Sequence, residues 1–363
     1  MSYRIESLPP DTDLDSKPVL KKVASARSAL AEMKGAAASI PNDSILINTL
    51  SLQEAKDSSA IENIITTHDE LFQSDYRKKQ FKTIASKEVQ HYVQALLTGF
   101  LTVKQKGLLT TNQILEIQAE LEQNRAGFRK LPGTELKNDQ TGETVYTPPQ
   151  TYDEIVALMT NLEHFINDPT LSDWDPLVKM AVIHHQFESI HPFYDGNGRA
   201  GRIINILYLV KEGLLDLPIL YLSRYINQHK GDYYRLLQKV RTDQAWEEWV
   251  LFILDAVEQT SLQTTTTIRS IKGLMQKHKY HIRTALPKIY SQDLLNNLFR
   301  HPYTKIDFVM ADLGVSRPTA TRYLDELTGL QILQKLKLGK DNYYVNQELF
   351  DLLANAGTQG TTS

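Results

Sequence analysis

Hydrophobic residues recur at helical spacing through most of the chain. Between Lys17 and Lys34 the apolar residues lie three or four positions apart, the pattern of a helix with one buried face. Helical spacing resumes at Ile45 and pauses at Asp57-Ser58, with a new helix expected from the next residue. The same spacing predicts helices at 83–106, 111–123, 153–166, 176–187, 198–213, 231–242 and 245–274. The chain is therefore predicted to be mostly α.

The segment from Lys130 to Pro149 breaks this helical pattern. Residues that favour β-structure lie at both of its ends, and residues 138–142, Asn-Asp-Gln-Thr-Gly, favour a turn between them. We therefore predict a β-hairpin at 134–147.

The last part of the chain follows a different order of elements. Helical patterns at 292–300, 304–313 and 317–327 precede two strand patterns, 332–338 and 342–345, around Gly339-Lys340-Asp341. This order predicts a C-terminal winged-helix (α+β) unit whose recognition helix is 317–327. With a boundary at 275–290, the expected domains are an N-terminal helical region (1–110), a core (111–275) and the winged-helix unit (290–355).

The net charge of the winged-helix unit does not decide whether its partner is DNA or another protein. Between residues 291 and 350 there are seven Lys or Arg residues and seven Asp or Glu residues. DNA binding depends on an excess of basic charge, which this unit lacks. The candidates for DNA contact are Arg317, Thr319, Arg322 and Lys340. Docking of a protein, including formation of a homodimer, is an equal alternative.

Composition narrows the classes of protein further. The 363 residues are 41% hydrophobic, enough for two or three domains with buried cores. The absence of cysteine excludes disulfides, thiolate metal sites and a cysteine nucleophile. The net charge of −3 gives no overall basic field for nucleic acid. Without an N-terminal signal pattern or an apolar run of about 18 residues, we expect a cytoplasmic protein with no membrane contact.

Residues 191–202, His-Pro-Phe-Tyr-Asp-Gly-Asn-Gly-Arg-Ala-Gly-Arg, concentrate the candidate chemistry. The backbone of Gly196 to Gly198 can form an anion-binding nest where the next helix begins. Arg199 and Arg202 lie three positions apart, so they share a helical face and can both bind phosphate oxygens. This arrangement favours a phosphate site over a simple turn with surface arginines.

Two further residues of this segment complete a nucleoside triphosphate site. Asp195 can hold Mg²⁺ through one carboxylate while phosphates supply other ligands. His191 titrates near neutral pH and suits a general base. The Gly-Lys-Ser/Thr ending of a Walker loop is absent from the chain.

This segment resembles the signature of the Fic family, His-x-Phe-x-Asp/Glu-Gly-Asn-Gly-Arg-x-x-Arg, at every defined position. The resemblance implies a Fic-type helical core and a protein adenylyltransferase, which transfers AMP from ATP to a Tyr, Ser or Thr hydroxyl and releases pyrophosphate. It implies that His191 is the base, that Asp195 holds Mg²⁺ or Mn²⁺, and that Phe193 anchors the loop in the core. The nucleotide-binding residues that it implies are Gly196, Asn197, Gly198, Arg199, Ala200, Gly201 and Arg202.

A second segment, Ser-Ser-Ala-Ile-Glu-Asn at 58–63, resembles the inhibitory motif of the same family, Ser/Thr-x-x-x-Glu-Gly/Asn. The resemblance implies that Glu62, within a motif that includes Ser58 and Asn63, pairs with Arg202 and displaces the γ-phosphate of ATP. An alternative is that Ser59 and Glu62 form a capping box at the start of a helix. The two readings are compatible.

The resemblance extends over residues 18–260. It implies that the 134–147 hairpin is a flap that binds the target protein as an added strand. It also implies that Tyr233 contacts adenine, although a core aromatic is an alternative. His184 and His185 are expected in the core, since adjacent helical residues point about 100° apart and rarely share one metal ion.

Two other functions remain open from the sequence. The chain can be a DNA-binding regulator that senses a nucleotide without turnover, although an intact His191 favours catalysis. The same site can also remove AMP from a modified protein, with Glu62 activating water.

Overall fold

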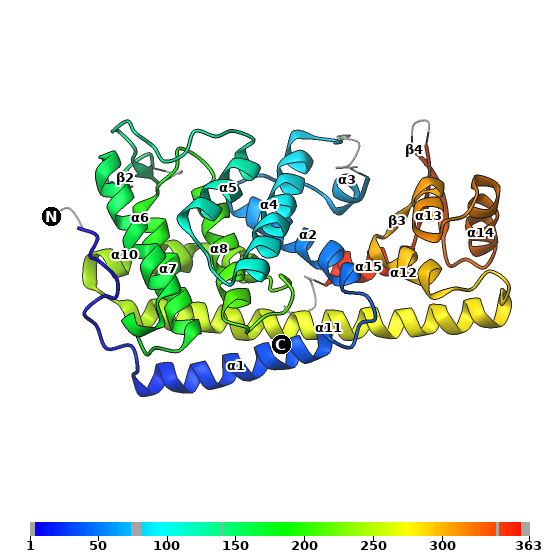
Figure 1. Cartoon of the computed structure of the whole chain (residues 1–363), viewed down its shortest axis with the longest axis horizontal. Coiled ribbons are helices and arrows are strands. Elements are labelled where there is room, and N and C mark those ends of the chain that lie inside the picture. Colours follow the sequence, from blue (N-terminus) through cyan, green and yellow to red (C-terminus); the bar gives the residue numbers. More distant parts are fainter. Residues whose placement is uncertain (1–3, 74–80, 139–140, 339–340, 357–363) are drawn as a thin grey trace.

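Two long helices lie side by side along the base of the molecule (Figure 1). They are α1 (Lys17–Ala37) and α11 (Trp246–Ala285), and Arg269 of α11 pairs with Glu32 of α1 at 2.8 Å. Ser16 begins α1 by accepting a hydrogen bond from the backbone N–H of Val19. The computed structural model describes residues 4–73, 81–138, 141–338 and 341–356.

The central helices lie above this base, and α7 and α8 are the most deeply buried of them. All of α7 from Leu177 onward is buried, as is α8 from Arg199 to Leu209. The loop between them, residues 191–196, is therefore anchored in the core by the buried Pro192 and Phe193, while Tyr194 and Asp195 are exposed. The bounds of the central helices are α4 (Ile84–Lys106), α5 (Thr111–Glu122), α6 (Tyr152–Asn167), α7 (Pro176–Ile190), α8 (Asn197–Lys211), α9 (Leu222–Gln228) and α10 (Lys230–Asp243).

The predicted hairpin is confirmed. Strand β1 (Leu136–Lys137) pairs antiparallel with β2 (Thr144–Tyr146). The Tyr146 hydroxyl donates a 2.8 Å hydrogen bond to the backbone oxygen of Ser189, which fixes the hairpin to α7 beside the central loop. The turn residues Asp139 and Gln140 lie outside the described residues.

The C-terminal unit has the predicted order of three helices followed by two strands, and its assignment as a winged helix stays a prediction. Its strands form one antiparallel sheet in the order β3-β5-β4. The turn residue Lys340, a predicted DNA contact, lies outside the described residues. Strand β3 and helix α15 are additions that the sequence pattern did not predict. The bounds are α12 (Gln292–Arg300), β3 (Tyr303–Thr304), α13 (Ile306–Leu313), α14 (Arg317–Gly329), β4 (Gln334–Leu338), β5 (Asp341–Val345) and α15 (Gln347–Asn355).

The expected pause at Asp57-Ser58 is wrong. Helix α2 (Asp43–Ile61) is continuous through this position, and it ends at Ile61, two residues after the predicted new start at Ser59. Burial of Glu54, Ser58 and Ser59 against the core explains why polar residues continue the helix here. A short helix, α3 (His68–Gln73), follows α2.

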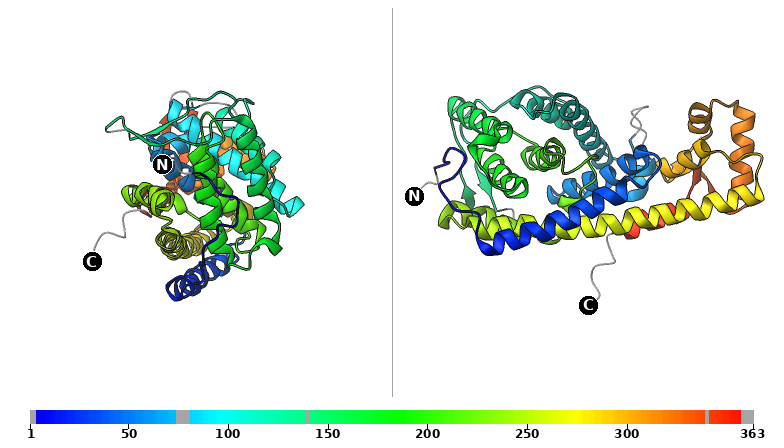
Figure 2. Two further views of the ribbon diagram at one scale, coloured as in Figure 1. Left: turned by 90° about the vertical axis from the view of Figure 1, so that its left-hand side faces the viewer. Right: turned by 60° about the horizontal axis from the view of Figure 1, so that its bottom comes forward.

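Most other predicted helices are confirmed with small shifts at their ends. Those expected at 83–106, 111–123, 153–166 and 176–187 shift by at most three residues. Helix α11 continues past Leu274 to Ala285, so one helix extends from the core to below the C-terminal unit (Figure 2). Helix α9 and the 3₁₀ turn η1 (Pro169–Leu171) were not predicted. No helix among the described residues is both long and apolar enough to cross a membrane.

Candidate active site

The loop between α7 and α8 turns at two residues with a left-handed backbone conformation. His191, directly after α7, has φ of 48°, and Gly196, directly before α8, has φ of 78°. Glycine adopts positive φ readily, whereas a histidine there is uncommon and requires support from its surroundings. The two turns place His191 and Asp195 in one short loop that leads into the N-terminus of α8.

Asn197 braces this loop from within. Its side-chain oxygen accepts a hydrogen bond from the Phe193 backbone N–H, and its side-chain nitrogen donates to the Phe193 backbone oxygen, both at 2.8 Å. The Phe193 ring is buried against Phe128 and Phe187, as the anchoring role requires. The Asn197 amide is thus committed to the shape of the loop, and a phosphate contact by this side chain stays a prediction.

Arg202 lies in the core and contacts the end of α2. Its Nε donates to the Ser58 hydroxyl at 2.8 Å, and its Nη2 donates to the Ser58 backbone oxygen at 3.1 Å and to Glu62 Oε1 at 2.8 Å. The predicted contact between Glu62 and Arg202 is therefore present, through one carboxylate oxygen. Glu62 Oε1 lies 2.3 Å from the position that a Cβ on Gly198 would occupy, so only glycine leaves room for it there.

The charges of this pair stabilise each other. Burial favours the neutral form of Glu62, but the Arg202 guanidinium, together with the positive charges of Arg199 and Lys230, outweighs it and holds the pKa of the carboxyl below its ordinary value. Burial opposes the charge on Arg202 as well, and the Glu62 carboxylate overcomes this and raises the pKa of the guanidinium. Both groups are therefore charged at neutral pH.

Glu62 is the C-cap of α2, whereas a capping box lies at the start of a helix. The capping-box interpretation is therefore wrong. The backbone N–H of Glu62 bonds to the Ser59 backbone oxygen, and Asn63 follows with φ of 62°. Lys230 of α10 donates to the backbone oxygen of Ile61 at 2.6 Å and lies 3.5 Å from Asn63 Oδ1. A cation at a helix C-terminus is electrostatically favourable, so Lys230 stabilises this end of α2.

Arg199 has two carboxylate partners that sequence reasoning missed. Its guanidinium, 4% exposed, lies 2.8 Å from Glu122 at the end of α5 and 3.4 Å from Glu88 of α4. Glu122 Oε1 is also 2.4 Å from the position of a Cβ on Gly196. Arg199 and Arg202 are thus each paired with a carboxylate that lies against a glycine. For Arg199 this glycine is Gly196, and for Arg202 it is Gly198. No local sequence pattern indicates these pairs, because they join helices far apart in the chain.

His191 is neutral at physiological pH. Burial and the positive charges of Arg129 and Arg241 lower the pKa of its imidazole to about 4. Arg129, also missed from the sequence, donates to the His191 backbone oxygen at 2.8 Å and to the Ile190 backbone oxygen at 3.3 Å. These bonds support the uncommon backbone conformation of His191, and the neutral imidazole has a lone pair to accept a proton.

Asp195 is exposed at the mouth of the loop. Its Oδ1 accepts a 2.7 Å hydrogen bond from the Gly196 backbone N–H, which fixes the carboxylate beside the N-terminus of α8. Among the described residues no cluster of three or more His, Cys, Asp or Glu side chains has metal-site geometry. One exposed carboxylate fits a Mg²⁺ whose other ligands are phosphates and water.

The sequence matches known family profiles along most of its length. Residues 20–101 match the profile described as the N-terminal part of the Fic/DOC family, and residues 108–209 match the Fic/DOC family profile itself. The chain belongs to the Fic/DOC family. Residues 274–349 also match the profile of the protein adenylyltransferase SoFic-like C-terminal domain.

Curated Fic proteins from insects are similar to part of the chain. Protein adenylyltransferase Fic of Drosophila virilis is 29% identical over 156 residues, which are 43% of this chain and 30% of that protein. The protein of the same name from Aedes aegypti is 28% identical over 169 residues, 47% of this chain and 31% of that protein. The chain thus matches about a third of the length of these relatives.

Solved structures of Fic proteins share the fold. A Fic family protein from Desulfovibrio desulfuricans aligns with a TM-score of 0.56 and 20% identity, over 93% of this chain and 98% of that one. Fic-1 from Caenorhabditis elegans aligns with a TM-score of 0.54 and 17% identity, over 69% of this chain and 74% of that one. The mostly helical Fic fold predicted from the sequence is therefore confirmed.

The remaining predicted residues lie deeper in the Fic core. Ala200 and Gly201 are buried in the first turns of α8. Tyr233 is 1% exposed and its hydroxyl lies 3.0 Å from Nε2 of His184, which matches the core alternative. His184 and His185 are fully buried, as expected. An adenine contact by Tyr233 stays a prediction.

A third carboxylate near the Fic loop was also missed. Glu188 of α7 is buried, and its Oε1, which has no hydrogen-bond partner, lies 2.7 Å from the position of a Cβ on Gly201. Burial raises the pKa of Glu188 to about 7, so this side chain takes up a proton far more readily than an exposed glutamate.

Proposed function

We propose that the chain is a protein adenylyltransferase that transfers AMP from ATP to a hydroxyl of a target protein and is inhibited by its own Glu62. The observation that carries the proposal is the meeting of the two motifs. An inhibitory-type glutamate at the end of α2 lies against the last arginine of an intact catalytic-type loop. The curated relatives that carry the name protein adenylyltransferase support the reaction class.

The loop residues supply the groups that the reaction requires. The hydroxyl oxygen of the target attacks the α-phosphorus of ATP, its proton passes to the neutral imidazole of His191, and the bond to the β-phosphate breaks to release pyrophosphate. Backbone N–H groups at the start of α8 and the two arginines bind the phosphates. A Mg²⁺ held by Asp195 would neutralise charge on the α- and β-phosphates.

The hairpin lies where a target segment would be needed. Tyr146 of β2 bonds to the backbone of Ser189, two residues before His191. An extended segment added to this hairpin would lie beside the base, and backbone hydrogen bonds would bind it with little dependence on its sequence.

Inhibition follows from competition for one guanidinium. Glu62 and the γ-phosphate would both require Arg202, and Glu62 also lies over Gly198, where the phosphates would approach. A hydrogen bond between charged groups contributes about 1.5–3 kcal/mol, which corresponds to roughly ten- to hundredfold inhibition. The Glu62 side chain is 36% exposed, so solvent screening places the effect toward the lower value.

The test compares AMP incorporation, by intact mass and by labelled ATP, in the wild type and the Glu62→Gly variant. We expect at least about tenfold more incorporation in Glu62→Gly. The Glu62→Gly, His191→Ala double variant should incorporate none while still binding nucleotide. A mass gain other than that of AMP, or full activity without His191, would overturn the proposal.

A further inference from the structure

We propose that the C-terminal unit controls the active site by holding α2, the helix that delivers Glu62, in its inhibitory position. This inference rests on the proposed function, because it concerns the release of the same inhibition. Helix α2 lies between the core and the C-terminal unit: its last turn contacts Arg202 in the core, its middle contacts the end of α15, and it also packs against α12.

The first tie is a buried amide on α2. Gln53 is 2% exposed, and its side-chain nitrogen donates to the backbone oxygen of Leu353 in α15 at 3.4 Å. Its side-chain oxygen lies 3.0 Å from Nε2 of His68 in α3. Buried polar groups lose free energy when a partner is withdrawn, so moving α15 would leave this amide nitrogen unpaired.

The second tie is a guanidinium that bridges three segments. Arg224 of α9, 7% exposed, donates through Nε to Asp57 of α2 at 3.2 Å and through Nη1 to the backbone oxygen of Ala356 at 2.9 Å. Asp57 directly precedes Ser58, the residue that bonds to Arg202. A single arginine therefore links the end of the C-terminal unit to the turn of α2 that reaches the active site.

The third tie holds the chain after Glu62. Phe72 of α3 is buried, and its ring packs against His301, Tyr303 and Phe350 with ring centres 5.0–6.2 Å apart. The Tyr303 hydroxyl donates to Asp69 of α3 at 2.5 Å. The segments before and after Glu62 are thus both fixed to the C-terminal unit, which brackets the inhibitory residue.

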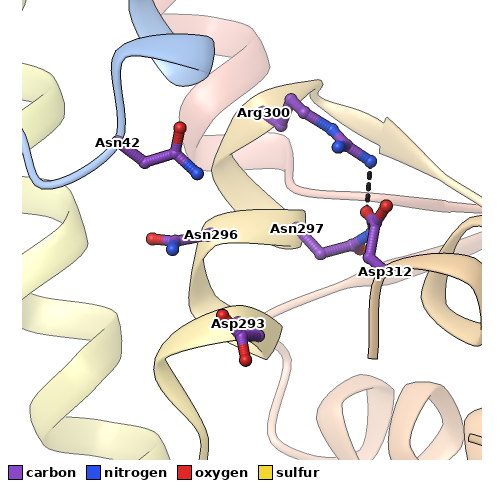
Figure 3. Close-up of a pocket in the computed structure, with 6 residues that line it drawn as sticks. All are labelled: Asn42, Asp293, Asn296, Asn297, Arg300 and Asp312. Carbon is purple, nitrogen blue, oxygen red and sulfur yellow. Dashed lines mark hydrogen bonds and ion pairs between the residues drawn. The ribbon is translucent and has the colours of Figure 1, made fainter. Parts of the chain in front are cut away.

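The two hydrogen-bonded ties on α2, at Gln53 and Asp57, lie in its C-terminal half. Beside its N-terminus, a polar cavity of about 150 Å³ separates Asn42 from α12 and α13 (Figure 3). In that view Asn42 faces Asn296 and Arg300 across the gap, and the Arg300 guanidinium turns instead toward Asp312. The hydrogen bonds of Gln53 and Arg224 therefore lie closer to Glu62 than this polar gap does.

A displaced C-terminal unit would weaken the docking of Glu62 without any change in the catalytic loop. The contacts of Gln53 and Phe72 with that unit and the bond from Arg224 to the Ala356 backbone oxygen would be lost, whereas the contacts of α2 with the core would remain. Each hydrogen bond lost would shift the equilibrium between the docked and released states of Glu62 by roughly two- to tenfold. A partner that pulls α15 away would thus activate the site.

The experiment uses the full chain with Arg224→Lys and Tyr303→Phe, singly and together. A lysine can bond to Asp57 or to the Ala356 oxygen but does not have the fork that spans both, and Tyr303→Phe keeps the ring and removes only the hydroxyl. The matched control is Lys277→Gln, which removes an exposed ion pair between α11 and α15 that does not involve α2. Circular dichroism checks that each variant is folded.

Three readouts separate the outcomes. We expect the double variant to show faster amide hydrogen exchange over residues 53–61, roughly two- to tenfold tighter binding of a fluorescent ATP analogue, and a matching rise in AMP incorporation, with the control unchanged. In the Glu62→Gly background the same substitutions should add nothing to incorporation. If both single variants keep the amide hydrogen exchange rates and the ATP-analogue affinity of the wild type, this inference is overturned. An inactive Glu62→Gly variant would instead count against the proposed function.

Discussion

Two helices of this protein begin with a pair of arginines, yet they present those arginines in opposite ways. In α8, Arg199 and Arg202 are 4% and 1% exposed. In α14, Arg317 and Arg322 are 63% and 64% exposed. The residue type and the position near a helix start are alike, so the surroundings make the difference.

The partners of the arginines explain this contrast. Those of α8 pair with Glu122 and Glu62, which are 77 and 140 positions away in the chain. Those of α14 pair with Asp307 and Glu326, which are 10 and 4 positions away. An arginine pair becomes a candidate phosphate site where distant helices enclose it, whereas local, solvated pairs contribute little free energy. DNA binding through α14 stays a prediction, and the acidic partners there weaken any attraction to phosphates.

The largest expected effect contrasts Arg202→Ala with Arg322→Ala. In the Glu62→Gly background, Arg202→Ala should lower AMP incorporation by more than about a hundredfold, because the γ-phosphate loses its anchor. It should also lower the free energy of unfolding by about 1–3 kcal/mol through the lost bonds to Ser58. Arg322→Ala should change the free energy of unfolding by less than about 0.5 kcal/mol. Equal destabilisation by the two substitutions in urea unfolding would remove the contrast.

The second prediction concerns pH. The pKa of His191 is lowered to about 4, so its imidazole stays neutral until the pH falls through that value. In Glu62→Gly, kcat/KM for AMP transfer should therefore change less than about twofold between pH 5.5 and 7.5. An unperturbed histidine, with a pKa of about 6.5, would lose about tenfold over the same range. A midpoint near 6.5 in this profile would mean that the burial of His191 does not set its protonation.

The third prediction tests the missed partner of Arg199. Glu122→Gln removes a negative charge beside the loop and keeps the shape of the side chain. The affinity of the Glu62→Gly variant for an ATP analogue should therefore rise about three- to tenfold. Glu116→Gln, on the exposed face of the same helix, is the matched control. Weaker binding in Glu122→Gln, measured by calorimetry, would show that Glu122 instead orients Arg199 for the phosphate.

The smallest effect compares one glycine from each helix. A Cβ at Gly198 would lie 2.3 Å from Glu62 Oε1, whereas a Cβ at Gly329 of α14 meets nothing within 4 Å. Gly329→Ala should raise the free energy of unfolding by about 0.4–1 kcal/mol. Gly198→Ala should push Glu62 away without activating transfer, since the methyl group takes the space that the phosphates require. Unfolding curves and AMP incorporation of both variants test this, and activation by Gly198→Ala would contradict it.

Local patterns in the sequence predicted a large part of this arrangement. Residues 191–202 indicated the loop, and helical spacing located most of the helices that carry it. The link between Glu62 and Arg202 came from two motifs whose resemblance to one family implied that they meet. These features succeed because each depends on neighbouring residues or on a pattern that a family shares.

The residues that the sequence did not reveal are those whose partners lie far away in the chain. Glu122, Glu88 and Arg129 act through partners on other helices, and an isolated charged residue carries no mark of such a partner. The polar end of α2 looked like a break because its helix depends on tertiary contacts. One of these is Glu54, which is buried against Ser223 and whose pKa burial raises to about 7. The short helices α3 and α9 likewise depend on packing more than on propensity.

Because α11 is one continuous helix, any change in its length would also rotate the C-terminal unit about the helix axis. In an α-helix each added residue advances the axis by about 1.5 Å and turns everything beyond it by about 100°. An insertion near Gly273 would therefore swing the C-terminal unit around the rod as well as move it outward. Insertions of seven residues, which come back to within about 20° of the original phase, would preserve the facing of α15 far better than insertions of two. The number of residues in α11 therefore decides which face of the C-terminal unit meets the core.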